Sequence, residues 1–146
     1  LIELMVTIAV LAIIVGIAAP SISTQLANQR VKSTTATLTN ALKEAKAESL
    51  IRRQNVRVVY NQANPSRAIT ILDANNVSLS TYTINSQSTI DVTPISVATV
   101  TFQPNKTIDI EGIVYSICDN ASSNETARQV RVSKIANIST MATGSC

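Results

Sequence analysis

The feature that most constrains this chain is a long stretch without charge at its N-terminal end. No charged residue occurs from Leu4 to Gln29, and the segment Leu4–Ala19 is almost entirely apolar. As a helix, these 16 residues would span about 24 Å, less than the hydrocarbon core of about 30 Å. The less hydrophobic continuation through Leu26 supplies the missing length. We therefore predict a single membrane-spanning helix with little length to spare.

A secretory signal peptide is the alternative interpretation of this stretch. Such a peptide begins with a basic region and ends at a cleavage site between small residues. Here the apolar run is preceded by Glu3 and by no basic residue, and Ala18-Ala19 is followed at once by Pro20. Both features favour the membrane-spanning helix.

Glu3 is the unusual residue of this segment, because a carboxylate at the mouth of an apolar helix is costly in lipid. In one interpretation it lies at the membrane surface, where the positive end of the helix dipole favours an anion. In the other it pairs with a positive group on a neighbouring subunit once the helix leaves the lipid.

The helical pattern continues beyond Pro20, which we expect to kink the helix rather than end it. We place Glu44 and Glu48 on an exposed face and the helix end near Arg52 or Arg53. About 50 residues of helix would be about 75 Å long, more than one small domain can cover, so the first half must project. The apolar positions at helical spacing are Ile22, Leu26, Val31, Leu38, Leu42, Ala45 and Leu50.

The rest of the chain is rich in β-branched residues, separated by polar turn signals. It predicts an α+β fold in which the amphipathic half of the helix covers the dry face of an antiparallel sheet. Turn signals stand at 64–66, 73–76, 103–106 and 119–124. The expected strands are Val56–Tyr60, Ala68–Leu72, Ser80–Ile84, Val97–Phe102, Gly112–Cys118 and Ala127–Ser133.

The 146 residues include two cysteines, Cys118 and Cys146, and no histidine. Because there is no C-x-x-C pair either, a zinc site or a thioredoxin-like site is not indicated. A structural disulfide formed in an oxidising compartment is the favoured interpretation, with two unrelated free thiols as the alternative.

Catalysis finds no support in the sequence, which also lacks a glycine-rich phosphate loop. The one imaginable carboxylate pair is Asp109 with Glu111, on a strand-like run 108–113 where both would point to solvent. We therefore expect no enzymatic activity, no cofactor and no bound metal.

The N-terminal residues resemble those of type IV pilins and type II secretion pseudopilins. The matching segment reads Leu1-Ile2-Glu3-Leu4-Met5-Val6, followed by an apolar run to Ala18-Ala19-Pro20. The motif of that family reads G-F-T-L-I-E, with cleavage after the Gly and methylation of the new N-terminal Phe. The resemblance implies that this chain starts two residues inside the mature protein.

Later segments resemble the GspH, FimT and FimU group of minor pilins. The stretch 41–56 is similar to that group's "L..AR.EAI.R...V" pattern, and 100–105 to its "v.F.p.G" strand and turn. The segments 117–119 and 127–133 are similar to its closing "lC…aR.v.vs" strands. The resemblance covers nearly the whole chain, strongly at the start and more loosely after residue 55.

This resemblance implies a type IV pilin fold with a projecting helical half. Residues 1–24 would be the transmembrane and filament-core helix, and residues 25–146 the globular domain, helical to about residue 53. It also implies that Glu3 is an assembly contact. The filament core would be formed by Leu4, Val6, Ile8, Val10, Leu11, Ile13, Ile14, Val15 and Ile17.

The implied partners are other major and minor pilins, contacted through the N-terminal helix, and a prepilin peptidase that acts on the precursor. The implied location is the bacterial inner membrane before assembly, with the globular domain in the periplasm, and the extracellular pilus afterwards. The eight basic residues between Arg30 and Arg67 would by the positive-inside rule indicate a cytoplasmic side. The resemblance implies that dedicated processing overrides this rule.

The function that follows is a minor pilin that takes part in the assembly or initiation of a type IV pilus, supporting twitching motility and DNA uptake. A GspH-like pseudopilin of type II secretion is one alternative.

A DNA-binding minor pilin of natural transformation is the other alternative, and the sequence disfavours it. DNA-binding FimT-type members carry a Gly-Arg-x-Arg turn after the "v.vs" strand, where this chain has Ala136-Asn137-Ile138-Ser139. Without those arginines the loop lacks cations for phosphate. The residues that could keep a weak DNA or partner contact are Arg128, Arg131 and Lys134. A FimU-like structural role is therefore favoured.

Overall fold

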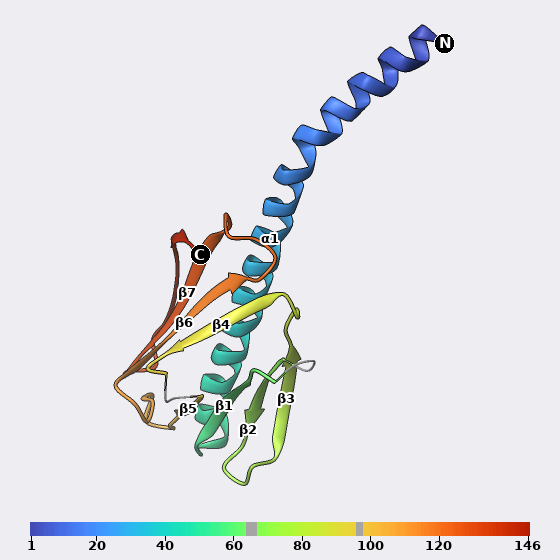
Figure 1. The fold of residues 1–146 in the computed structure, drawn as a ribbon. Coiled ribbons are helices and arrows are strands. Elements are labelled where there is room, and N and C mark those ends of the chain that lie inside the picture. Colours follow the sequence, from blue (N-terminus) through green and yellow to red (C-terminus); the bar gives the residue numbers. More distant parts are fainter. Residues whose placement is uncertain (64–66, 96–97) are drawn as a thin grey trace.

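The computed structural model describes residues 1–63, 67–95 and 98–146 and is dominated by one helix, α1 (Ile2–Arg52). The helix ends where the sequence predicts, because Arg53 adopts the left-handed conformation, with φ 55°, that commonly closes a helix. Arg52 also pairs with Glu48 one turn earlier. Figure 1 shows the first half of α1 projecting away from the domain and the second half lying against the strands.

The strands form two antiparallel sheets. The first has the order β3-β2-β1-β5 and the second the order β4-β6-β7-β8. The bounds are β1 (Val56–Asn61), β2 (Ala68–Leu72), β3 (Ser78–Thr83), β4 (Ser88–Thr93), β5 (Thr99–Phe102), β6 (Gly112–Asp119), β7 (Thr126–Ser133) and β8 (Ile138–Ser145).

The predicted α+β fold, a long helix on antiparallel strands, is confirmed, but two strands were missed. Strand β8 is the exposed edge of its sheet, and its sequence ISTMATGS shows no apolar alternation. Strand β4 has only two apolar residues, Ile90 and Val92, although Ile90 is fully buried in the core. Both strands are completed by backbone pairing, β4 with β6 and β8 with β7.

The six predicted strands are all present, with ends shifted by at most two residues and β2 as predicted. Strand β3 begins at Ser78 rather than Ser80, and β5 begins at Thr99 because Ala98 is not part of the strand. Val97 and the turn expected at 64–66 lie outside the described residues. The strand-like run 108–113 was wrong before Gly112, since Ile108 makes only an isolated bridge to Phe102. Asp109 and Glu111 are nevertheless exposed, as expected.

The core lies between the second half of α1 and the two sheets. Leu38 and Leu42 of the helix are fully buried, and Ile71, Phe102 and Tyr115 meet them from the strands. Burial on the helix begins at Ala27, and Ile22 and Leu26 are exposed.

The placement of Glu44 on an exposed face was also wrong. This carboxylate is partly buried and accepts hydrogen bonds from the hydroxyl groups of Ser80 and Tyr82 on β3. Glu44 thereby joins the packed half of α1 to β3, an edge strand of the first sheet.

Candidate membrane and assembly surface

The projecting half of α1 is an apolar rod without cover. An 18-residue window in this helix has a mean hydropathy of 2.6, and none of it is buried. By length and composition α1 could cross a membrane. All nine residues predicted for the filament core are exposed: Leu4, Val6, Ile8, Val10, Leu11, Ile13, Ile14, Val15 and Ile17. An apolar surface of this extent is unfavourable in water, so lipid or protein must cover it.

Glu3 lies in the first turn of α1 and is exposed. Within the residues that the structure describes, no cation lies within ion-pair distance of its carboxylate. The residue is therefore available for a contact from outside the subunit, and its role as an assembly contact stays a prediction.

Pro20 lies inside α1, which continues through it without a break. Proline has no N–H, so the carbonyl of Gly16, four residues earlier, lacks its helical donor. The hydroxyl groups of Ser23 and Thr24 donate to the Pro20 carbonyl at 3.0 and 3.3 Å. The axis of α1 changes direction between its projecting and packed halves (Figure 1). That Pro20 causes this bend stays a prediction.

An ion pair fixes the helix to the domain near the point where the projecting half begins. The Arg30 guanidinium donates to both carboxylate oxygens of Asp119, at 2.6 Å from Nε and 3.1 Å from Nη2. The Asp119 side chain is fully buried and that of Arg30 is 25% exposed. The hydrogen bond from Arg30 is the main cause that lowers the pKa of Asp119 below its ordinary value.

Two further contacts order the region around this ion pair: one lies within the β6–β7 connection, and the other joins the start of β7 to α1. The Glu125 carboxylate accepts from the backbone N–H of Asp119 at 3.0 Å, and the Asn28 side-chain carbonyl accepts from the N–H of Thr126 at 2.9 Å. We call Asn28, Arg30, Asp119 and Glu125 the collar. Sequence reasoning missed these residues, because their partners lie about 90 positions apart or across a loop. The only signal was that Arg30 is the first charge after the apolar segment.

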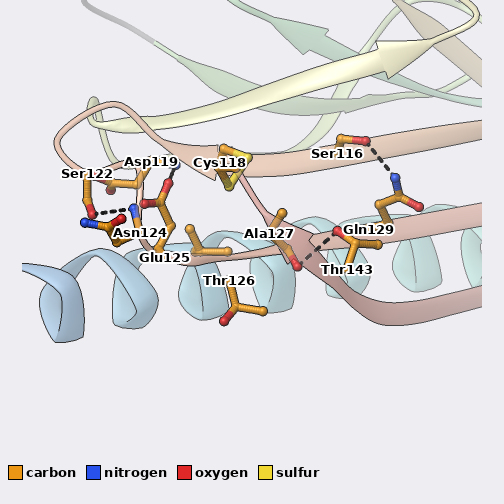
Figure 2. Close-up of a disulfide and its surroundings, with 12 residues drawn as sticks. Ser116, Cys118, Asp119, Ser122, Asn124, Glu125, Thr126, Ala127, Gln129 and Thr143 are labelled. Carbon is orange, nitrogen blue, oxygen red and sulfur yellow. Dashed lines mark hydrogen bonds between the residues drawn. A yellow bond between two sulfur atoms is a disulfide. The ribbon is translucent and has the colours of Figure 1, made fainter.

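The predicted disulfide between Cys118 and Cys146 is confirmed, with Cα atoms 5.9 Å apart. It joins β6 to the end of the chain beyond β8. Figure 2 shows Glu125 beside it, reaching to the backbone of Asp119. Ligand atoms of Cys118, Glu125 and Cys146 lie within 4.8 Å of one another. Because both sulfur atoms are used in the disulfide, neither is the thiolate that a metal ion requires.

The structure does not gather Arg128, Arg131 and Lys134 into one basic cluster. Arg128 is half-buried on the helix side of β7, whereas Arg131 is exposed on the opposite face and contacts Gln129. Lys134 pairs with Glu111 at 3.3 Å. The positions that would carry the DNA-binding arginines are 136–139. They form the end of the tight β7–β8 turn and the start of β8. In this turn the Ser133 N–H donates to the Asn137 carbonyl.

A long helix with an exposed apolar first half, packed through its second half on antiparallel sheets, defines the type IV pilin fold. The comparison with solved structures agrees. The structure is similar to the type IV minor pilin FimU of Pseudomonas aeruginosa, with a TM-score of 0.67 and 18% identity over 81% of this chain and 96% of that one. A second crystal form of FimU gives a TM-score of 0.64 at 19% identity, over 79% and 98% of the two chains.

The minor pseudopilin EpsH of the Vibrio cholerae type 2 secretion system has the same fold. Its TM-score is 0.60 at 12% identity, over 77% of this chain and 97% of that one. No protein-family model matches the sequence, and no curated protein matches it. At these identities the similarity establishes the fold, the type IV pilin fold, and leaves the function to be argued from the surface.

Proposed function

We propose that this protein is a minor pilin, a subunit that is anchored in the bacterial inner membrane and then built into a type IV pilus. The observation that carries the proposal is the projecting half of α1, which is exposed and apolar over its whole circumference. In a soluble protein such a surface would be unfavourable, because it exposes apolar side chains to water. A filament subunit needs it twice, first against lipid and then against the helices of other subunits.

The position of Glu3 supports the second use. In lipid an unpaired carboxylate is costly, whereas in a filament it can pair with a positive group of a neighbouring pilin. The cost in the membrane and the gain in the filament both favour assembly. Minor pilins of the FimU kind would be its partners, and initiation or stabilisation of the pilus its task, with twitching motility as the cellular outcome.

The processing and location are part of the same proposal. A prepilin peptidase would cut and methylate the precursor, and the globular domain would lie in the periplasm. The disulfide supports this side of the membrane, because disulfides persist in oxidising compartments.

Substitution Glu3→Ala tests the assembly role. The variant should still insert in the inner membrane, because the apolar surface is unchanged, but should be depleted at least tenfold from pili sheared off the cells. Immunoblots of membranes and of sheared pili, compared with wild type, measure both. Glu111→Ala is the matched control, since Glu111 is an exposed carboxylate at the far end of the domain, and it should be incorporated normally. Normal incorporation of Glu3→Ala would refute the assigned role.

A pseudopilin of type II secretion is the second candidate, because EpsH shares the fold. Deletion of the gene distinguishes the two. If the protein is a minor pilin, the deletion should abolish surface pili and leave protein secretion normal. If it is a pseudopilin, the deletion should abolish protein secretion and leave surface pili normal.

A further inference from the structure

A polar hollow of about 390 Å³ lies where the packed half of α1 meets the start of β7. Its lining comes from two elements that are about 100 residues apart in the sequence, and every lining side chain is polar. The residues are Gln25, Asn28, Gln29 and Lys32 of α1 with Thr126 and Arg128 of β7.

Two cations face this hollow without an acidic partner. Within the described part of the chain, the ion pairs involve Arg30, Arg52 and Lys134, and none involves Lys32 or Arg128. The neighbouring cation Arg30 is different, because Asp119 already neutralises it. Two like charges at one hollow repel each other unless an anion lies between them.

Asn28 adds neutral donors to the same hollow. Its side-chain carbonyl accepts from the Thr126 N–H at 2.9 Å, which fixes the amide group and leaves its NH₂ for another acceptor. The hollow therefore offers two positive charges and amide donors, which is the chemistry that binds a phosphate.

The position along α1 indicates where such a phosphate comes from. If the apolar half spans a bilayer, the hydrocarbon ends near Ile22, about 20 residues into the helix. Gln25 then lies about 4.5 Å beyond that boundary and Lys32 about 15 Å. Helical side chains lean toward the N-terminus, so the long Lys32 side chain returns several ångströms toward the membrane. The rim of the hollow thus lies at headgroup depth, in a layer about 5–8 Å thick.

We propose that this hollow binds the phosphate of an anionic phospholipid headgroup, such as phosphatidylglycerol, in the leaflet from which α1 emerges. The inference rests on the proposed membrane anchoring. A lipid supplies the phosphate at high local concentration and at the right depth. A free phosphate has neither advantage. Binding there holds the membrane-bound subunit at one depth and rotation, with the collar at the level of the headgroups.

The test uses the full chain, labelled with ¹⁵N, in zwitterionic micelles. Short-chain phosphatidylglycerol is titrated in, and the amide signals of Asn28, Lys32 and Thr126 are followed. We expect saturable shifts for wild type and a dissociation constant raised about 25-fold in Lys32→Gln/Arg128→Gln, since each cation near a lipid surface contributes about fivefold. The matched control Lys43→Gln/Arg131→Gln removes the same charge from the same two elements outside the hollow, and should bind like wild type.

Two comparison ligands identify the source of the phosphate. Short-chain phosphatidylcholine should bind at least tenfold more weakly. Inorganic phosphate that binds as tightly as phosphatidylglycerol would overturn the lipid assignment, and so would equal binding by the double variant. If Lys32→Gln/Arg128→Gln keeps its lipid affinity but is lost from sheared filaments, the hollow is a subunit contact and the proposal is wrong.

Flotation with phosphatidylcholine vesicles separates this proposal from the anchoring on which it rests. All variants should float, because the apolar half of α1 is intact in each. A wild-type chain that does not float would refute the anchor. A chain that floats but shows no preference for phosphatidylglycerol would refute the headgroup site alone.

Discussion

At the residue scale, the Arg30–Asp119 pair decides how firmly the projecting helix is held to the domain. The pair is bidentate, and the carboxylate is fully buried. Removing one partner of such a pair leaves the other desolvated without compensation. We predict that Arg30→Ala lowers the free energy of unfolding by about 2–3 kcal/mol, less than for a fully buried pair because Arg30 keeps some water contact.

Urea unfolding of the full chain in neutral detergent measures this change. Lys43→Ala is the control, because Lys43 is exposed on the same helix, and should change stability by less than about 0.5 kcal/mol. An Arg30→Ala midpoint equal to wild type would contradict the assigned role.

The same pair predicts an acid dependence. The pKa of Asp119 is lowered in the folded protein, mainly by the hydrogen bond from Arg30, so the unfolded state binds the proton more readily. The stabilisation is fully present above the unfolded pKa of about 4 and is lost as the pH falls through the lower folded pKa. Between pH 5 and pH 2, wild type should lose more stability than Asp119→Asn, which has no such proton to bind. Parallel slopes for the two proteins would contradict this.

At the element scale, β8 depends on the disulfide more than on its own side chains. It is an edge strand whose residues are mostly exposed, and it is held by pairing with β7 and by the Cys118–Cys146 bond. The bond closes a loop of 28 residues in sequence separation, worth about 3–4 kcal/mol in the chain-entropy model.

We therefore predict that Cys118→Ser/Cys146→Ser lowers the free energy of unfolding by about 3 kcal/mol and speeds amide exchange in β8 before the rest of the sheet. Hydrogen exchange measured by mass spectrometry checks both. Reduced wild type is the control, since it should behave like the double variant. Exchange that rises equally in all strands would contradict the local effect.

The sequence predicted some elements well and others poorly, for physical reasons. The helix was readable because its apolar positions recur at helical spacing and its end carries Arg52 and Arg53. Strand β8 was not readable because its side chains are mostly exposed and pairing with β7 forms it, and β4 was not readable because only two of its six residues are apolar. The exposed apolar half of α1 was visible from the uncharged run. The collar and the polar hollow were not, because Arg30 meets Asp119 and Lys32 meets Arg128 only after the chain has folded.

At the scale of the whole molecule, α1 has two halves with different surroundings: the first is exposed and apolar, and the second packs into the core of the domain. Its 51 residues would extend about 77 Å, and burial begins only at Ala27. The domain is built as an aqueous unit with its own core, while the projecting half is left for lipid or for other helices. The collar and the disulfide lie near the junction of the two halves of α1. Any force on the subunit as it moves from membrane to filament would act at this junction.

The measurement that tests this account most directly is photo-crosslinking from the projecting half of α1 in living cells. A photoreactive amino acid replaces the exposed Ile13, and in a second strain the exposed Ile135 of the β7–β8 turn. We predict that the Ile13 probe crosslinks to lipid in the membrane fraction and to another pilin's helix in sheared filaments, whereas the Ile135 probe crosslinks to neither. An Ile13 probe that crosslinks to neither lipid nor pilin would contradict it.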